Sequence, residues 1–181
     1  QILGGWLDKA EGVVFSNWRI GPFNDSADYI FGQDFGFSVD PTTLIKVAVD
    51  KDRRVMWVKT MFTKPGLSTK DIGEMNRRYA GEDLIICDNA EPRLISELQE
   101  YCNLKPTIKR SGSILTGIAL VQDYDLVIDS DSTELIKELN NYVWHERNQK
   151  PIDRWNHQLD ALRYASQYFL ANANKGVYVI R

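Results

Sequence analysis

Three aspartates lie in apolar surroundings where an unpaired acid would be out of place. Asp34 lies inside the segment Tyr-Ile-Phe-Gly-Gln-Asp-Phe-Gly-Phe, and Asp88 follows the apolar run 84–87 directly. Asp160 is surrounded by leucine and alanine in a segment with helical spacing. Because burying an uncompensated carboxylate is costly, each of these acids needs a cation or a proton as its partner.

Metal binding is the chemistry that these acids could share. Three carboxylates from different elements form an oxygen-rich ligand set, which suits Mg²⁺ or Mn²⁺ better than zinc. Two such ions, roughly 3.5 to 4 Å apart, can hold the attacking and leaving oxygens of a phosphodiester. His157 precedes Asp160 by three positions, so helical spacing places both side chains on one face. The residue types therefore predict a divalent-metal centre with a histidine beside it.

Each of these residues also has a simpler structural explanation. Asp34 could be a solvent-facing strand residue, and Asp88 could cap a helix that begins at Pro92. Asp160 could be an exposed helical acid, and His157 an ordinary surface or core histidine. The apolar neighbours of Asp34 favour the metal-ligand hypothesis.

The order of strands explains how these acids could meet. Runs rich in Val, Ile, Phe and Trp predict strands over 29–37, 42–50 and 53–63, joined by short polar breaks as in an antiparallel meander. The later run 84–87 is continuously apolar, which is typical of a parallel strand covered on both faces. Asp88 would then lie at the carboxyl edge of the sheet, where α/β proteins usually place their ligand sites.

The remaining segments predict helices around this sheet. Expected helices cover 68–79, 92–101, 114–122, 133–143 and 154–173, with short extended pieces at 107–110 and 126–128. The pattern indicates an α/β fold with a mixed β-sheet, in which an antiparallel three-strand meander is followed by parallel strands and flanked by helices. We expect residues 1–28 to be an irregular leader or interdomain connection and residues 29–181 to form the domain.

Composition sets limits on the class of protein. The 181 residues are 43% hydrophobic and 26% charged, as in ordinary globular domains. No apolar run approaches the roughly 18 residues of a membrane span, and no signal-peptide layout is present, so we expect a soluble, non-secreted protein. Cys87 and Cys102 are expected to be buried thiols in a reducing cytosol. A net charge of −3 means that any nucleic-acid binding must rely on local basic groups.

Four motifs, in their order along the chain, resemble a known family. They are Gly-Gln-Asp-Phe-Gly-Phe-Ser-Val-Asp-Pro-Thr at 32–42, Cys-Asp-Asn-Ala-Glu-Pro at 87–92, Lys-Arg-Ser-Gly-Ser-Ile at 109–114 and Asn-His-Gln-Leu-Asp-Ala-Leu-Arg-Tyr-Ala at 156–165. Any one alone is weak, but together they resemble the C-terminal ribonuclease-H-like nuclease domain of the tailed-phage terminase large subunit. The resemblance spans nearly the whole chain and implies a ribonuclease-H-like mixed sheet.

The resemblance also implies roles for the acids. Asp34, Asp88 and Asp160 fall on the family's carboxylate metal ligands and would hold Mg²⁺ or Mn²⁺, with two ions expected. Our hypothesis is that Asp34 bridges the two ions, that Asp88 and Asp160 each complete the shell of one, and that an activated water attacks phosphorus. His157 matches a family histidine and could steer this water, bind the scissile phosphate or stabilise Asp160.

Residues around the acids are given supporting roles. Glu91 could orient Asp88, make another contact outside the metal ligands, or cap its helix. The second motif has Asn89 where the family usually has Ser, a small departure. The candidate DNA contacts, expected from their charge and their position in or near the third motif, are Lys105, Lys109, Arg110 and Ser113.

The expected function is that of an endonuclease that cuts concatemeric double-stranded viral DNA during genome packaging. The expected partners are DNA, the motor ATPase domain of the same full-length protein, the small terminase subunit and the portal or procapsid, in the cytoplasm of the bacterial host. No Gly-x-x-x-x-Gly-Lys-Ser/Thr pattern is present, so this fragment should neither hydrolyse ATP nor translocate DNA.

Two other functions compete with this one. Another ribonuclease-H-like nuclease, such as a resolvase or transposase, can also use clustered acids, although the extended motif order disfavours it. A noncatalytic DNA-binding or assembly module is the alternative from a different class. It would be supported if the three acids did not converge or bound no Mn²⁺.

Overall fold

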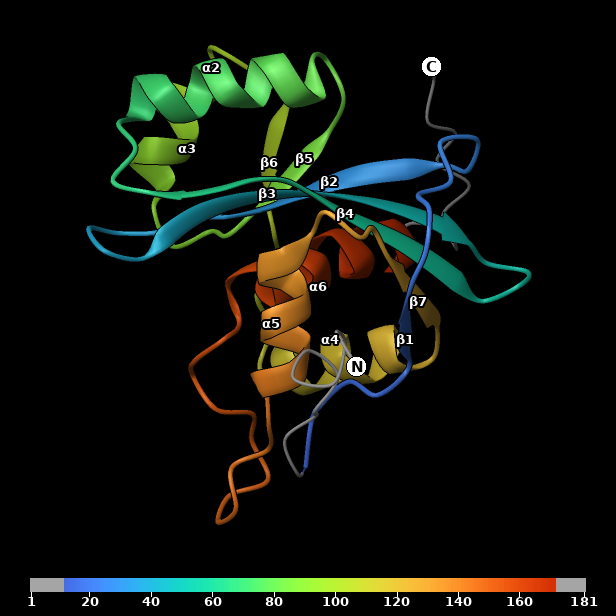
Figure 1. The fold of residues 1–181 in the computed structure, drawn as a ribbon. Helices are drawn as coiled ribbons and strands as arrows, with labels where there is room; N and C mark the ends of the chain where they lie inside the picture. Colours follow the sequence, from blue (N-terminus) through green and yellow to red (C-terminus); the bar gives the residue numbers. More distant parts are fainter. Residues whose placement is uncertain (1–11, 172–181) are drawn as a thin grey trace.

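The computed structural model describes residues 12–171, which form one mixed seven-stranded sheet with helices on both faces (Figure 1). The strands are β1 (Trp18–Ile20), β2 (Tyr29–Asp34), β3 (Pro41–Asp50), β4 (Val55–Pro65), β5 (Ile85–Cys87), β6 (Leu104–Pro106) and β7 (Asp125–Ile128). The helices are α2 (Thr69–Ala80), α3 (Pro92–Leu98), α4 (Ser113–Gln122), α5 (Thr133–Asn141) and α6 (His157–Ala171). None of the helices in this described part is long and apolar enough to cross a membrane.

The predicted antiparallel meander forms the centre of the sheet. Strand order is β1-β7-β4-β3-β2-β5-β6, and β2, β3 and β4 pair antiparallel. The parallel strands β5 and β6 extend the sheet beyond β2, while β7 and β1 extend it in parallel beyond β4. The mixed sheet expected from the sequence is therefore confirmed, with parallel strands on both sides of the meander.

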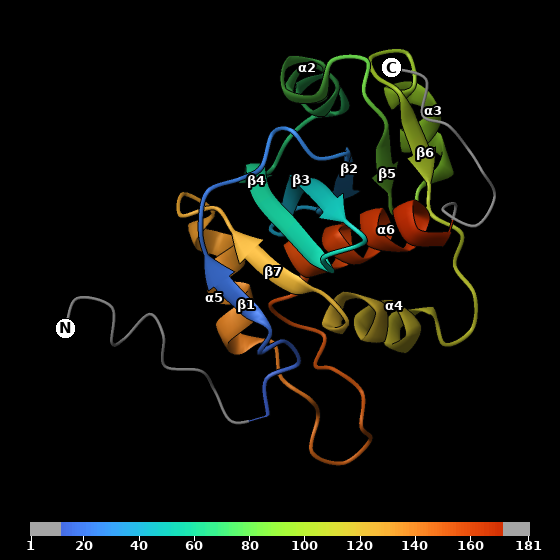
Figure 2. The ribbon, with the colours of Figure 1, turned by 90° about the vertical axis from the view of Figure 1, so that its right-hand side faces the viewer.

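Helices cover the two faces of the sheet unequally. Figures 1 and 2 show α2 and α3 on one face, and α4, α5 and α6 on the other. Two buried hydrophobic clusters match this division. The larger one joins the sheet to α4, α5 and α6, and the smaller one joins it to α2 and α3. The sheet is thus buried on both faces, which explains the continuously apolar run that forms β5.

Helix α6 packs very closely against β2 because small residues face each other there. A Cβ atom added to Gly32 would lie 2.1 Å from the carbonyl oxygen of Ala161 and 3.1 Å from Cβ of Ala165. Only glycine allows this approach of helix and strand. The contact brings the first turn of α6 to the carboxyl end of β2, where Asp34 lies.

Three stretches differ from the elements expected from sequence. Residues 18–20, expected to be irregular, form β1 and pair in parallel with β7. Residues 107–110, expected to be a strand, follow β6, which ends at Pro106. The buried anchor of that strand is Leu104, whereas Ile108 is 77% exposed, so the β-branched pair at 107–108 was a misleading signal. Strand β2 ends at Asp34 instead of continuing to Phe37, which is exposed.

Several helix ends also depart from expectation, since α3 ends at Leu98 instead of 101 and α5 ends at Asn141 instead of 143. The last helix begins at His157, three residues later than expected, since Trp155 adopts a positive φ of 58° that interrupts a helix. Its expected last residues, 172 and 173, lie outside the described part of the chain. Helix α4 begins at Ser113, one residue earlier than expected, and Gly112 with φ of 75° occupies its N-cap position.

Candidate active site

Asp34 and His157 lie against each other where β2 ends and α6 begins. Nδ1 of His157 is 3.3 Å from Oδ2 of Asp34, whose side chain is only 14% exposed. The other ring nitrogen of His157, Nε2, is 3.9 Å from Oδ1 of Asp40 in the loop after β2. The imidazole is therefore held between two carboxylates.

Asp160 follows one turn later on α6 and is largely buried. Its Oδ1 accepts a hydrogen bond of 3.1 Å from Nη2 of Arg163, and its Oδ2 accepts one of 3.3 Å from Nδ2 of Asn156. Arg163 is itself buried, with a side chain 7% exposed, and packs against Gly117 of α4. Sequence reasoning missed Arg163, although a basic residue three positions after Asp160 within an apolar helix was a usable signal.

Asp88 is brought beside Asp34 by the pairing of their strands. Gln33 of β2 is in register with Cys87 of β5, and the N–H of Asp88 donates to the carbonyl of Gln33 at 3.2 Å. Nζ of Lys109 lies 2.5 Å from Oδ1 of Asp88. This oxygen is buried, and the ammonium group of Lys109 neutralises it.

The charges of Asp160 and Asp88 both act on Asp34. Burial, followed by the negative charges of Asp160 and Asp88, raises the pKa of Asp34 from its ordinary value of 3.8 to about 6, although His157 opposes this rise. Burial also raises the pKa of Asp160, against the influence of Arg163 and His157. The contact with Asp34 raises the pKa of His157. All three pKa values are raised, so Asp34, Asp160 and His157 each bind a proton more readily in the folded protein. A positive charge placed between the acids would therefore be favourable.

The ligand set fits a divalent cation in chemistry. All three acids offer carboxylate oxygens, which Mg²⁺ and Mn²⁺ prefer, and Oδ1 of Asp88 is buried beside a single cation, the ammonium group of Lys109. Within residues 12–171, however, no group of three or more His, Cys, Asp or Glu side chains is arranged to hold one ion. Each acid instead faces a different cation of the chain, namely His157, Lys109 or Arg163. The ligand roles stay predictions.

Of the other predicted site residues, one contacts an acid directly, and the rest lie on neighbouring elements. Lys109 is at Asp88, while Lys105 in β6 and Arg110 in the next loop are exposed. Ser113 begins α4, and its carbonyl accepts a hydrogen bond from Gln167. Glu91 occupies the N-cap position of α3, but its side chain makes no capping hydrogen bond, so that suggested role is wrong. Its role in orienting Asp88 stays a prediction.

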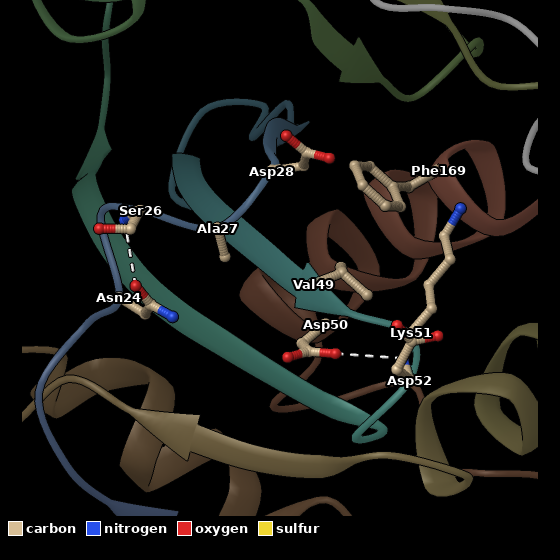
Figure 3. Close-up of a pocket in the computed structure, with 9 residues that line it drawn as sticks. All are labelled: Asn24, Ser26, Ala27, Asp28, Val49, Asp50, Lys51, Asp52 and Phe169. Carbon is tan, nitrogen blue, oxygen red and sulfur yellow. Dashed lines mark hydrogen bonds between the residues drawn. The ribbon is translucent and has the colours of Figure 1, made fainter.

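A cavity of about 510 Å³ lies at the opposite end of β2 and α6 from the acids. Figure 3 shows its walls, which include Asp28 before β2, Asp50 at the end of β3, Lys51 in the following turn, and Phe169 near the end of α6. The antiparallel register of β2 and β3 places this end far along the strands from the Asp34–Thr43 pair. The cavity is therefore separate from the acidic centre, the name used below for Asp34, Asp88 and Asp160 together.

Comparison with known families and structures agrees with this fold. The family model described as "Terminase RNAseH like domain" matches residues 34–167. The nuclease domain of the large terminase (g2p) of bacteriophage SPP1, solved with bound Mn, is 26% identical with a TM-score of 0.75. That match covers 87% of this chain and 99% of the SPP1 domain. The expected ribonuclease-H-like fold is thereby confirmed.

Two further structures share the fold at lower identity. The large terminase nuclease of the thermophilic phage G20c, with bound magnesium, is 17% identical with a TM-score of 0.62, covering 87% of this chain and 98% of that one. The large terminase of a second thermophilic bacteriophage is 20% identical with a TM-score of 0.71. That match covers 90% of this chain but 46% of the other, so this chain spans about half of that second terminase. No curated protein matched.

Proposed function

The chain belongs to the terminase ribonuclease-H-like domain family, and on that premise we propose that it is a Mg²⁺- or Mn²⁺-dependent endonuclease that cuts concatemeric viral DNA during genome packaging. The observation that carries the proposal is that Asp34, Asp88 and Asp160 gather where β2 and β5 end and α6 begins, and that burial first, and then the charges of Asp160 and Asp88, raise the pKa of Asp34. Such a centre of like charge suits a divalent cation better than any residue of the chain.

Asp34, Asp88 and Asp160 would hold the metal ions. When bound, these ions supply a Lewis acid that activates water and neutralises charge on the scissile phosphate. The SPP1 domain is described with bound Mn, which supports a divalent metal here. Two ions remain our expectation, because two are needed to stabilise both the attacking and the leaving oxygen of a phosphodiester.

The chain's own residues prepare this site. Arg163 and Asn156 each donate to one oxygen of Asp160 and so fix the plane of its carboxylate. The raised pKa of His157 favours the protonated ring, which can donate toward Asp34 and Asp40. His157 thereby orients Asp34 and places a proton at the rim of the site, where a phosphate oxygen could accept it.

DNA binding requires cations outside the acidic centre. We propose that Lys105, Lys109, Arg110 and Ser113, on β6 and the segment leading into α4, contact DNA phosphates beside Asp88. Lysine and arginine at phosphates supply affinity without sequence preference. The proposal therefore predicts nonspecific, salt-dependent binding by this domain.

The wider setting is part of the same proposal. The chain would act together with the motor ATPase domain of a full-length terminase, because it spans about half of the large terminase from the second thermophilic phage. The small terminase subunit and the portal or procapsid would deliver and time the DNA, in the cytoplasm of the bacterial host. The family match favours this setting over that of a resolvase or transposase.

Plasmid cleavage tests the proposed activity. The unmodified domain and the variants Asp34→Asn, Asp88→Asn and Asp160→Asn are incubated with supercoiled plasmid in Mn²⁺, in Mg²⁺ or in chelator. We expect metal-dependent nicking and linearisation by the unmodified domain and a large loss in every variant. Unchanged cutting by all three variants would overturn the assignment of the site. A domain that binds DNA but neither cuts it nor binds Mn²⁺ would be the noncatalytic module.

A further inference from the structure

The first turn of α6 carries His157 and Asp160, so its position determines where these two side chains lie relative to Asp34. His157 is the first residue of this helix, and Asp160 follows within the same turn. The N–H groups of a first helical turn lack acceptors within the helix. In α6, two of these groups are satisfied by another helix, since Oε2 of Glu138 in α5 accepts from the N–H of Gln158 at 2.9 Å and of Leu159 at 3.1 Å.

Glu138 is unusual for a glutamate because it is only 6% exposed. Burial raises its pKa to about 7, although the N–H groups of Leu159 and Gln158 and the charge of His157 lower it. A buried carboxylate is costly unless hydrogen bonds or positive charge compensate it. Here the compensation comes from a helix N-terminus, where the backbone dipoles favour negative charge.

A second polar connection joins the same two helices through the sheet. The hydroxyl of Thr60 in β4 donates to Oε1 of Gln158, and the N–H of Thr60 donates to Oγ of Ser132 at 2.9 Å. Ser132 stands at the N-cap position of α5. Ser132 and Gln158 are both buried. The first turn of α6 is therefore tied to α5 directly through Glu138 and indirectly through β4.

We infer that Glu138 is a positioning residue for the acidic centre, which acts by fixing where α6 begins and hence where His157 and Asp160 stand relative to Asp34. Its link to metal binding and cleavage rests on the proposed function. Its effect on the first turn of α6 stands without it. Glu138 reaches the acidic centre through its hydrogen bonds to the backbone of Gln158 and Leu159, while its charge also acts on His157 and Asp160.

The test compares variants of two glutamates on α5. Glu138→Ala removes both hydrogen bonds, whereas Glu138→Gln keeps an oxygen that can accept them. Glu134→Ala is the matched control, since Glu134 lies one turn earlier, is exposed and pairs at 2.7 Å with Lys137 on the surface. The measurements are Mn²⁺ affinity by calorimetry, hydrogen exchange at the amides of Gln158 and Leu159 by NMR, and kcat and KM for plasmid cleavage.

We expect Glu138→Ala to weaken Mn²⁺ binding by about 10-fold, the lower end of the effect of removing groups that support metal ligands. It should also speed exchange at the two amides and lower kcat with little change in KM. Glu138→Gln should recover most of the Mn²⁺ affinity, and Glu134→Ala should match the unmodified domain. This rescue separates positioning from a general loss of folding.

A folded Glu138→Ala variant with unchanged Mn²⁺ affinity and unchanged amide exchange would overturn the inference. If that variant does not fold, Glu138→Asp replaces it. The aspartate side chain is one methylene shorter, so it keeps the charge but cannot reach both N–H groups in the same way. Wild-type behaviour of Glu138→Asp would then overturn the inference. If the unmodified domain binds no Mn²⁺, the proposed function fails instead, and the amide exchange alone decides the role of Glu138.

Discussion

The ammonium group of Lys109 lies 2.5 Å from Oδ1 of Asp88, an oxygen that is otherwise buried. A lysine expected to contact DNA phosphates thus neutralises one of the three acids. Lysine is a compact cation on a flexible stem, so it can leave this position without moving the backbone. Lys109 and a metal ion would compete for the same oxygen of Asp88.

This competition predicts that Lys109→Ala strengthens Mn²⁺ binding. Removal of a cation next to a metal ligand leaves Asp88 with more charge to offer, and we expect a several-fold gain, equivalent to about 1 kcal/mol for a partly exposed ion pair. Calorimetric titration with Mn²⁺ measures it, with Arg110→Ala as the control because Arg110 is the exposed neighbour. Weaker Mn²⁺ binding by Lys109→Ala would mean that the lysine supports the metal site and does not compete with it.

The buried charge of Asp34 predicts that this acid lowers the stability of the metal-free domain at high pH. Its pKa rises from 3.8 to about 6 on folding, so the protonated acid is the form that the fold favours. The stability contributed by that proton is complete below about pH 4 and is lost as the pH rises through about 6. Without metal at pH 8, Asp34→Asn should therefore stabilise the domain, on the order of 1–3 kcal/mol.

Urea unfolding in chelator at pH 8 and pH 5 checks this prediction. The gain from Asp34→Asn should shrink at pH 5, where the unmodified acid is largely protonated. Asp40→Asn serves as the control, because Asp40 also faces His157 but is 60% exposed. If Asp34→Asn destabilised the domain at both pH values, the contact between Asp34 and His157 would outweigh the repulsion and burial of the acid.

The close packing of α6 on β2 predicts a strong effect of Gly32→Ala. The added Cβ would lie 2.1 Å from the backbone of Ala161, which cannot move without shifting the helix. We expect a loss of stability of about 1–3 kcal/mol or more, together with weakened Mn²⁺ binding, as measured by urea unfolding and calorimetry. Gly66→Ala is the comparison, since it places a strained residue at φ of 67° in open space.

The comparison separates packing from general destabilisation. Gly66→Ala should cost stability through its positive φ, by roughly 1 kcal/mol, and leave the affinity for Mn²⁺ unchanged. Equal Mn²⁺ affinities in folded Gly32→Ala and in the unmodified domain would show that the position of α6 does not control the acidic centre.

The convergence of the acids could be predicted from sequence because it depends on strand order. The meander and the apolar strand before Asp88 were recognisable from periodicity, and two acids at strand ends meet when those strands pair. The Asp160–His157 pair followed from helical spacing. These features are local in sequence or follow from rules of sheet topology.

The partners of the acids could not be predicted in the same way. The sequence predicts a short strand over 107–110, and this prediction does not indicate that Lys109 would contact Asp88. Nothing in the segment 133–141 distinguishes Glu138 from Glu134, because both are ordinary helix-forming acids. Their difference arises only when α6 places its N-terminus against one of them. Such contacts depend on tertiary packing rather than on local pattern.

A crystal of the domain soaked in Mn²⁺ tests the central claim most directly. Anomalous diffraction locates Mn²⁺ without assumptions about activity, and Asp88→Asn crystals soaked in the same way provide the control. We predict anomalous peaks bound by Asp34, Asp88 and Asp160, with the ammonium group of Lys109 displaced from Asp88. Anomalous peaks that avoid these three carboxylates, or none at saturating Mn²⁺, would contradict the assignment of this site as the metal centre of a nuclease.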